Sequence, residues 1–181
     1  MEMILNANFQ LYLAAYLLGA IPFGWLFVKV LAKKDIRNVG SGGSGATNVY
    51  RALKDCGIDG AKRYGIATIV LDAIKITIPL LVAKLLGVQE SVLWAMAFFA
   101  VVGHCYSVYL LFDGGKGVAT AFGALIVMVP FEALIGFGVW FLAAKYSKIS
   151  SLSSLLGLIA LVLSSFVLSP GLGVGSQVPV L

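Results

Sequence analysis

Long apolar runs are the feature that most constrains the fold of this chain. Only 12% of its 181 residues are charged, whereas soluble domains carry about 25%. A helix needs about 20 predominantly apolar residues to cross a bilayer. Six candidate spans are expected, of which the fourth and fifth are short, at about residues 9–31, 64–86, 91–112, 117–131, 131–146 and 152–169. The sequence predicts an all-α, polytopic integral membrane helix bundle in which residues 1–181 form a single domain.

The basic residues are unevenly distributed between the two ends of these spans. Of the 13 lysines and arginines, all except Lys75 and Lys84 lie at the ends that carry the polar segments. Cytoplasmic loops carry an excess of lysine and arginine, so these segments are expected to face the cytoplasm and the amino terminus to lie outside. With six spans, Leu181 would also lie outside. We interpret the net charge of +5 as a sign of membrane orientation, not of a nucleic-acid partner.

Three polar segments, rich in glycine or serine, are expected at this face. Residues 40–51 read GSGGSGATNVYR, residues 103–120 read GHCYSVYLLFDGGKGVAT, and residues 145–154 read KYSKISSLSS. Glycines allow backbone N–H groups to converge on an anion, and the amino end of a following helix adds a favourable dipole. The composition predicts a site for a phosphorylated ligand at a bilayer surface.

The first segment contains a G-x-G-x-x-G pattern, but a dinucleotide-binding fold requires a preceding strand. A membrane span precedes it here, so we reject that fold. A short helix is expected over Thr47–Lys54 with the glycine loop at its amino end, and a flexible linker is the alternative interpretation. The candidate phosphate ligands are Ser41, Gly42, Gly45, Thr47, Asn48 and Arg51, the last because a guanidinium binds phosphate bidentately.

The second segment places three glycines around a lysine. Gly114, Gly115 and Gly117 flank Lys116, although the P-loop pattern G-x-x-x-x-G-K-[ST] is not satisfied. We interpret these four residues as a second phosphate-binding loop. The alternative is a glycine turn whose lysine marks the cytoplasmic side.

Other polar residues admit two interpretations each. His104 is the only histidine and is either structural or part of the site, and no Ser-His-Asp triad can be assembled around it. Asp72 and Lys75 share a helix face within the second span, where each charge costs about 2.5–3.5 kcal/mol. We interpret them as a structural ion pair beneath the site, with direct ligands as the alternative. Ser150 and Ser151 are either helix caps or hydroxyl donors.

Together these segments resemble the bacterial acyl-phosphate-dependent glycerol-3-phosphate acyltransferases, the PlsY family. The family patterns SGNxGATNxxR, LDxxKGxxP and GHxxPVFxxFKGGKGVAT, and a serine stretch before the penultimate helix, match in order and spacing across about residues 12–165. This chain has Gly43, Ile76, Ser107 and Asp113 where the family commonly has asparagine, glycine, proline and lysine.

The resemblance implies acyl transfer from a fatty acyl phosphate to the 1-hydroxyl of glycerol 3-phosphate. The products would be 1-acyl-glycerol 3-phosphate (lysophosphatidic acid) and phosphate, in the first step of phospholipid synthesis. It implies a multi-pass protein of the bacterial cytoplasmic (inner) membrane, among membrane lipids, with its site facing the cytoplasm. No cofactor, metal or nucleic acid is implied. The catalytic residues would be His104, Lys116 and Ser151.

The family also has a seventh helix that closes with a histidine–asparagine–arginine segment. Nothing after Ser169 resembles it, so the C-terminal helix is expected to be absent from this chain. Two other classes stay open at this point. The chain is alternatively a small membrane transporter or binding protein for a phosphorylated metabolite, or an inactive truncated acyltransferase.

Overall fold

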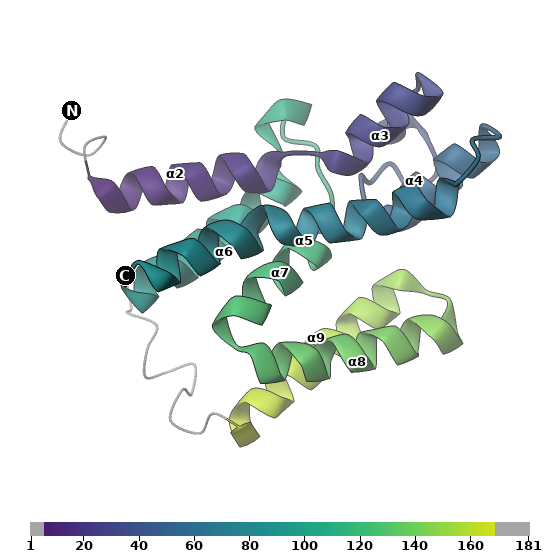
Figure 1. Ribbon diagram of the computed structural model, residues 1–181. Coiled ribbons are helices and arrows are strands. Elements are labelled where there is room, and N and C mark those ends of the chain that lie inside the picture. Colours follow the sequence, from purple (N-terminus) through teal and green to yellow (C-terminus); the bar gives the residue numbers. More distant parts are fainter. Residues whose placement is uncertain (1–5, 169–181) are drawn as a thin grey trace.

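A computed structural model describes residues 6–168 of the chain, and all regular secondary structure in this range is helical (Figure 1). The predicted all-α class is confirmed. The expectations for residues 169–181, namely the outside position of Leu181 and the missing seventh helix, lie outside the described residues. The helices are α2 (Ala7–Ala20), α3 (Phe23–Ala32), η1 (Ile36–Asn38), α4 (Ala46–Asp55), α5 (Ala61–Leu85), α6 (Glu90–Cys105), η2 (Val108–Leu110), α7 (Val118–Met128), α8 (Pro130–Ser147) and α9 (Ser150–Leu168).

Four helical segments in the described range are long and apolar enough to cross a membrane. They are Ala7–Ala32, Ala61–Leu85, Glu90–Leu110 and Ser150–Leu168. The two remaining predicted spans correspond to α7 and α8, which the sequence already marks as short. At 1.5 Å per residue, the 11 residues of α7 extend about 16 Å, roughly half the hydrocarbon thickness. The architecture is that of a multi-pass membrane protein.

The first predicted span is not one continuous helix. It is interrupted at Ile21–Pro22, where Pro22 has a non-helical ψ of 73°, because proline lacks an N–H donor and its ring disfavours a helical residue before it. The break leaves carbonyl groups of α2 to be satisfied from elsewhere. Lys75 Nζ lies 3.0 Å from the Ile21 carbonyl oxygen, and Ser107 Oγ donates to the Ala20 carbonyl at 2.6 Å.

The third predicted span also differs, because α6 ends at Cys105 instead of near residue 112. The chain then turns through η2, which Arg37 contacts by donating to the Leu110 carbonyl at 3.3 Å. Asp35 accepts hydrogen bonds from the same guanidinium, with an Nη2–Oδ2 distance of 2.7 Å. These bonds hold the pKa of the Asp35 carboxyl well below its usual range. Arg37 thereby connects the stretch just before the first polar segment to the second segment.

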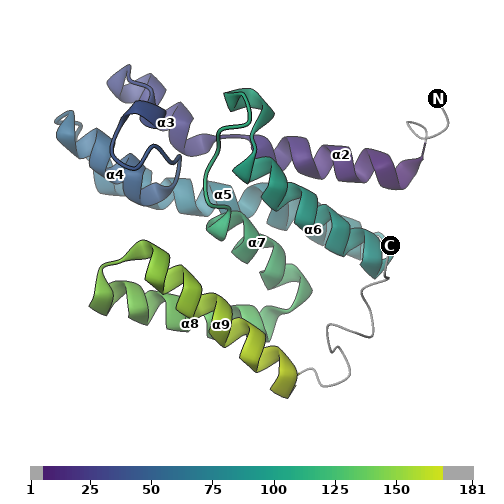
Figure 2. The same cartoon turned by 180° about the vertical axis from the view of Figure 1, so that it is seen from behind.

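Close packing of small residues holds neighbouring helices together, both in the layer of α2, α5 and α6 and in the α8–α9 hairpin. Gly19 in α2 lies against the Ala100 backbone, and Gly103 in α6 lies against the Tyr16 carbonyl, an arrangement typical of membrane helix pairs. Gly136 and Gly157 make the equivalent contact between α8 and α9. Figures 1 and 2 show α7 running from the layer of α2, α5 and α6 toward the α8–α9 hairpin.

Candidate active site

A cavity of about 610 Å³ collects residues from all three polar segments. Its walls come from the loop before α4 and from α4 itself, from α5, from the end of α6, from the start of α7, and from the α8–α9 connection. The three segments are far apart in sequence, yet all three contribute residues to this one cavity. The expected common site is therefore present. The predicted residues that line it are Ser41, Gly45, Thr47, Asn48, Arg51, Asp72, His104, Lys116, Gly117, Ser150 and Ser151.

The first glycine loop is shaped by Asn48, whose side chain is buried. Its Nδ2 group donates to the carbonyls of Val39 at 2.8 Å and Gly43 at 2.9 Å, and its Oδ1 accepts from the Ser41 N–H at 3.2 Å. Gly40 has a positive φ of 58°, and a Cβ there would overlap with Asn48 Oδ1. Because both the nitrogen and the oxygen of its side-chain amide bond the loop backbone, Asn48 orders the loop. Thr47 and Arg51 on the same helix line the cavity.

The amino end of α4 is open toward that cavity. Gly45 is the N-cap, with extended backbone (φ −75°, ψ 159°) and no side-chain capping bond. Within residues 6–168, the N–H groups of Gly45, Ala46 and Thr47 have no hydrogen-bond acceptor. Unpaired N–H groups at a helix amino end attract anions. The predicted helix over Thr47–Lys54 is confirmed as Ala46–Asp55, and it supplies this feature.

Three exposed cations line the cavity without a partner in the described part of the chain: Arg51, Lys116 and Lys148. Lys148 was not among the predicted site residues. It ends α8 in a left-handed conformation (φ 57°), and its place beside Ser150 in the third polar segment was the signal available in the sequence. By contrast, Lys54 and Lys145 lie over the rings of Tyr50 and Tyr146 and do not line the cavity.

A buried polar cluster forms the deep wall of the cavity. The predicted ion pair is present, with Lys75 Nζ 2.9 Å from Asp72 Oδ1. The same nitrogen lies 2.9 Å from His104 Nδ1, and Thr120 Oγ1 lies 3.2 Å from that ring nitrogen. Asp72 and His104 also line the cavity, whereas Lys75 does not. One member of the pair therefore reaches the cavity wall, and its interpretation as a structural brace stays a prediction.

Three glycines that were predicted to bind ligand do not line the cavity: Gly42, Gly114 and Gly115. A Cβ on Gly114 would overlap with the carbonyl oxygens of His104 and Cys105. A Cβ on Gly115 would overlap with His104 Nε2, and the Gly115 N–H donates to the His104 carbonyl at 3.0 Å. The structure thus gives these two glycines a packing function against α6. Gly42 has a positive φ of 75°, which a turn requires.

Ser150 and Ser151, two of the five serines in the third segment, are the first two residues of α9. Neither hydroxyl accepts from a backbone N–H among the described residues, so the structure gives the capping interpretation no support, and both exposed side chains line the cavity. The nearby Ser153 is buried and donates to the Ile149 carbonyl at 2.8 Å. The hydroxyl-donor interpretation stays a prediction.

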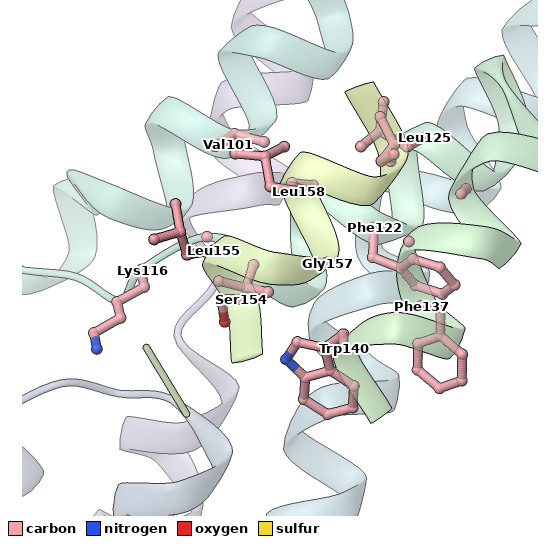
Figure 3. Close-up of a pocket in the computed structure, with 16 residues that line it drawn as sticks. Val101, Lys116, Phe122, Leu125, Phe137, Trp140, Ser154, Leu155, Gly157 and Leu158 are labelled. Atoms are coloured by element: carbon pink, nitrogen blue, oxygen red, sulfur yellow. The ribbon is translucent and has the colours of Figure 1, made fainter. Parts of the chain in front are cut away.

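A second cavity of about 420 Å³ lies between α6, α7, α8 and α9 and is lined mostly by apolar side chains (Figure 3). Phe122, Phe137 and Trp140 belong to both cavities, as do Lys116 and Ser154. In Figure 3 the Lys116 side chain points away from the apolar residues. A polar chamber therefore adjoins an apolar one, and Trp140, whose buried Nε1 has no partner among the described residues, lies at their boundary.

No group of three or more histidine, cysteine, aspartate or glutamate side chains in residues 6–168 is arranged to hold a metal ion. The chemistry of the cavity is instead that of cations, hydroxyls and backbone N–H groups. These are ligands for a phosphate group.

The chain matches the family described as glycerol-3-phosphate acyltransferase over residues 9–181. A glycerol-3-phosphate acyltransferase of Aliarcobacter butzleri is 52% identical over 179 residues, which cover 99% of this chain and 86% of the relative. One from Sulfurimonas denitrificans is 51% identical and covers 94% of this chain and 83% of the relative.

Solved structures agree with this match. The crystal structure of PlsY (YgiH), an integral membrane glycerol 3-phosphate acyltransferase, in its glycerol 3-phosphate form has a TM-score of 0.80 and 41% identity, covering 91% of this chain and 78% of that one. Its lysophosphatidic acid form has a TM-score of 0.77 and 39% identity, with the same coverage. The family match, the sequence relatives and the solved structures all agree. This chain therefore belongs to the glycerol-3-phosphate acyltransferase family.

Proposed function

We propose that this protein transfers a fatty acyl group from acyl phosphate to the 1-hydroxyl of glycerol 3-phosphate. The observation that carries the proposal is the pair of adjoining cavities, one polar with three unpaired cations and one apolar. A phosphorylated substrate with a long acyl chain needs both environments. The solved relatives are described as glycerol 3-phosphate and lysophosphatidic acid forms, which are an acceptor and a product of this reaction.

The polar cavity supplies groups for the phosphates that both substrates carry. Arg51 and the amino end of α4 form one side, and Lys116 lies on the α7 side of the same cavity. Asn48 and the glycines at 42, 114 and 115 act by shaping the two loops. The direct ligands in this proposal are Ser41, Gly45, Thr47, Arg51, Lys116 and Gly117, the catalytic residues are His104, Lys116 and Ser151, and the Asp72–Lys75 pair supports the deep wall.

The reaction requires little covalent chemistry from the protein, because an acyl phosphate is already activated. The 1-hydroxyl oxygen forms a bond to the acyl carbon, and the bond from that carbon to the phosphate oxygen breaks. Phosphate leaves with the electron pair and accepts the hydroxyl proton. Positioning of the two substrates and stabilisation of the developing charge supply the catalysis. No metal, cofactor or nucleic acid takes part.

We place the protein in the bacterial cytoplasmic membrane, with residues 1–181 acting as one domain and the cavity open to the cytoplasm. The basic residues around the cavity support this orientation. Single cysteines placed near Gly43, Gly115 and Lys148 are expected to react with an impermeant reagent only from the cytoplasmic side. Labelling from outside at any of these positions would contradict the orientation.

The activity itself is tested with purified protein in detergent. Long-chain acyl phosphate and glycerol 3-phosphate together should release phosphate and form lysophosphatidic acid in equal amounts. Omitting glycerol 3-phosphate measures background hydrolysis, and acyl-CoA should not replace acyl phosphate. Equal turnover with acyl-CoA would overturn the donor assignment. Uptake of glycerol 3-phosphate into proteoliposomes without release of phosphate would instead indicate a transporter.

A further inference from the structure

The environment of Lys75 determines what its ammonium group can do. Its Nζ lies 2.9 Å from Asp72 Oδ1, 3.0 Å from the Ile21 carbonyl oxygen and 2.9 Å from His104 Nδ1. An ammonium group has three N–H donors and no acceptor. Three potential acceptors surround it here, and the buried carboxylate of Asp72 requires a cation beside it. Each of the three N–H bonds therefore has one acceptor.

This arrangement determines the tautomer of His104. Because Lys75 only donates, Nδ1 of His104 must accept and cannot carry a proton. The Thr120 hydroxyl, 3.2 Å from the same nitrogen, is also able to donate to it. In a neutral imidazole one nitrogen accepts and the other carries the proton, so the proton lies on Nε2. Protonation of both nitrogens would set an N–H group directly against the Lys75 ammonium.

The Nε2 atom is the ring position that a ligand is able to reach. It has no hydrogen-bond partner in residues 6–168, and His104 lines the polar cavity. The Gly115 backbone packs against this nitrogen, since a Cβ there would overlap with Nε2. Glycine at position 115 therefore lets the imidazole keep its place at the cavity wall. The site thus holds an N–H donor with a fixed orientation, since the opposite side of the ring is bound by Lys75 and Thr120.

We infer that His104 is a hydrogen-bond donor to the reacting acyl group through Nε2–H, not a general base, and that Lys75 is the positioning residue that fixes this tautomer. This inference rests on the proposed acyl transfer. When the glycerol oxygen adds to the acyl carbon, the carbonyl electrons move onto oxygen and an oxyanion forms. Nε2–H donates to that oxyanion, and the positive charge of Lys75 behind the ring strengthens the bond. His104 gains and loses no proton in the step.

The tautomer is tested directly by NMR, because the chain has a single histidine. Protein labelled with ¹⁵N-histidine should show one protonated and one unprotonated ring nitrogen at neutral pH. Couplings to the ring protons should assign the proton to Nε2. A proton on Nδ1, or an imidazolium, would overturn the inference. The measurement needs no activity, so it stays decisive even if the proposed reaction is wrong.

The part of Lys75 is tested against a matched lysine on the same helix. Lys84 also donates to a carbonyl, that of Val127 at 2.8 Å, but it makes no hydrogen bond to His104 in the described part of the chain. Lys75→Met should give a mixture of tautomers, and Lys84→Met should keep the wild-type spectrum. If Lys75→Met fails to fold because Asp72 is left unpaired, the double variant Asp72→Leu/Lys75→Met replaces both charges. A single Nε2–H tautomer in the folded variant would show that Lys75 does not select it.

The donor function is tested by comparing two replacements of His104. Glutamine keeps an N–H donor but cannot act as a base, whereas alanine keeps neither. Loss of one oxyanion donor typically lowers kcat by about 10²–10³, so His104→Ala should fall in that range with KM little changed. His104→Gln should retain at least roughly a tenth of wild-type kcat. Equal inactivity of both folded variants would overturn the donor assignment and favour a base.

Discussion

The two glycine-rich loops look alike in sequence and differ in what their glycines do. In the first loop, a Cβ on Gly45 would meet nothing within 4 Å, and the N–H groups that follow are free. In the second loop, a Cβ on Gly114 would overlap with two backbone carbonyls of α6. The first loop therefore offers backbone donors to a ligand, whereas the second uses glycine to let the chain pass close to α6.

The loops also differ in how they are held. The first is ordered by one side chain, Asn48, which bonds its backbone from within. The second is held by tertiary contact, through the bond from the Gly115 N–H to the His104 carbonyl. Its residues that line the cavity are Lys116 and Gly117. A glycine motif thus indicates that the backbone approaches another group closely. The tertiary structure decides whether that group is a ligand, as at the first loop, or a helix, as at the second.

The largest expected effect separates the two kinds of glycine. Gly114→Ala should destabilise the protein by about 1–3 kcal/mol or more, because the overlapping atoms belong to rigid backbone. Gly45→Ala should leave stability nearly unchanged, since its φ of −75° suits alanine. Thermal unfolding of both variants in detergent measures this, with several degrees expected between them. Equal melting temperatures would erase the distinction between the loops.

The second expected effect tests whether each loop contributes a cation. Arg51→Ala and Lys116→Ala should each lower kcat/KM at least about tenfold, or about 1.4 kcal/mol of transition-state stabilisation, with little change in melting temperature. Lys54→Ala is the control, because Lys54 lies on the same helix as Arg51 but over the Tyr50 ring. If Lys116→Ala were as active as the control, the second loop would serve packing alone.

A smaller effect is expected at the third polar segment. Lys148→Gln should raise KM a few-fold, in keeping with the roughly 0.2–1 kcal/mol typical of an exposed charge pair, and the effect should shrink at high salt. Lys145→Gln, which removes a cation outside the cavity, should match wild type. Identical kinetics for the two variants would return Lys148 to the role of a membrane-surface charge.

The smallest effect concerns the link between the loops through Asp35 and Arg37. The Arg37 guanidinium lowers the Asp35 pKa, so the pair stabilises the fold above the unfolded-state pKa of about 4. This contribution declines as the pH falls through the lower folded-state pKa. Asp35→Asn should therefore melt slightly below wild type at neutral pH, and the difference should narrow at roughly pH 3.

The matched control for that measurement is Asp59→Asn, since Asp59 is exposed and has no ion pair among the described residues. It should melt like wild type at both pH values. A difference between Asp35→Asn and wild type that stays constant down to the acid end would mean that the Asp35 carboxylate charge is not what holds the loops together.

Local chemistry was enough to predict the membrane helices, the short helix α4 and the Asp72–Lys75 pair. Each depends on residues near one another in the chain, through apolar length, the amino-end pattern of a helix, or three-residue spacing on one face. The gathering of the polar segments into one cavity also followed, because each pair of consecutive spans returns the chain to the same membrane face. The apolar runs and the basic residues at their ends therefore determined the class of the protein and where its site would be.

Only the tertiary structure decided the details that give the site its chemistry. The break at Ile21–Pro22 matters because a lysine 54 residues away reaches the freed carbonyl. Gly114 and Gly115 pack because the end of α6 passes beside them, and His104 has a defined tautomer because Lys75 lies behind its ring. Such features depend on contacts between distant parts of the chain, whose distances and directions are set by helix packing and are not encoded in any local pattern.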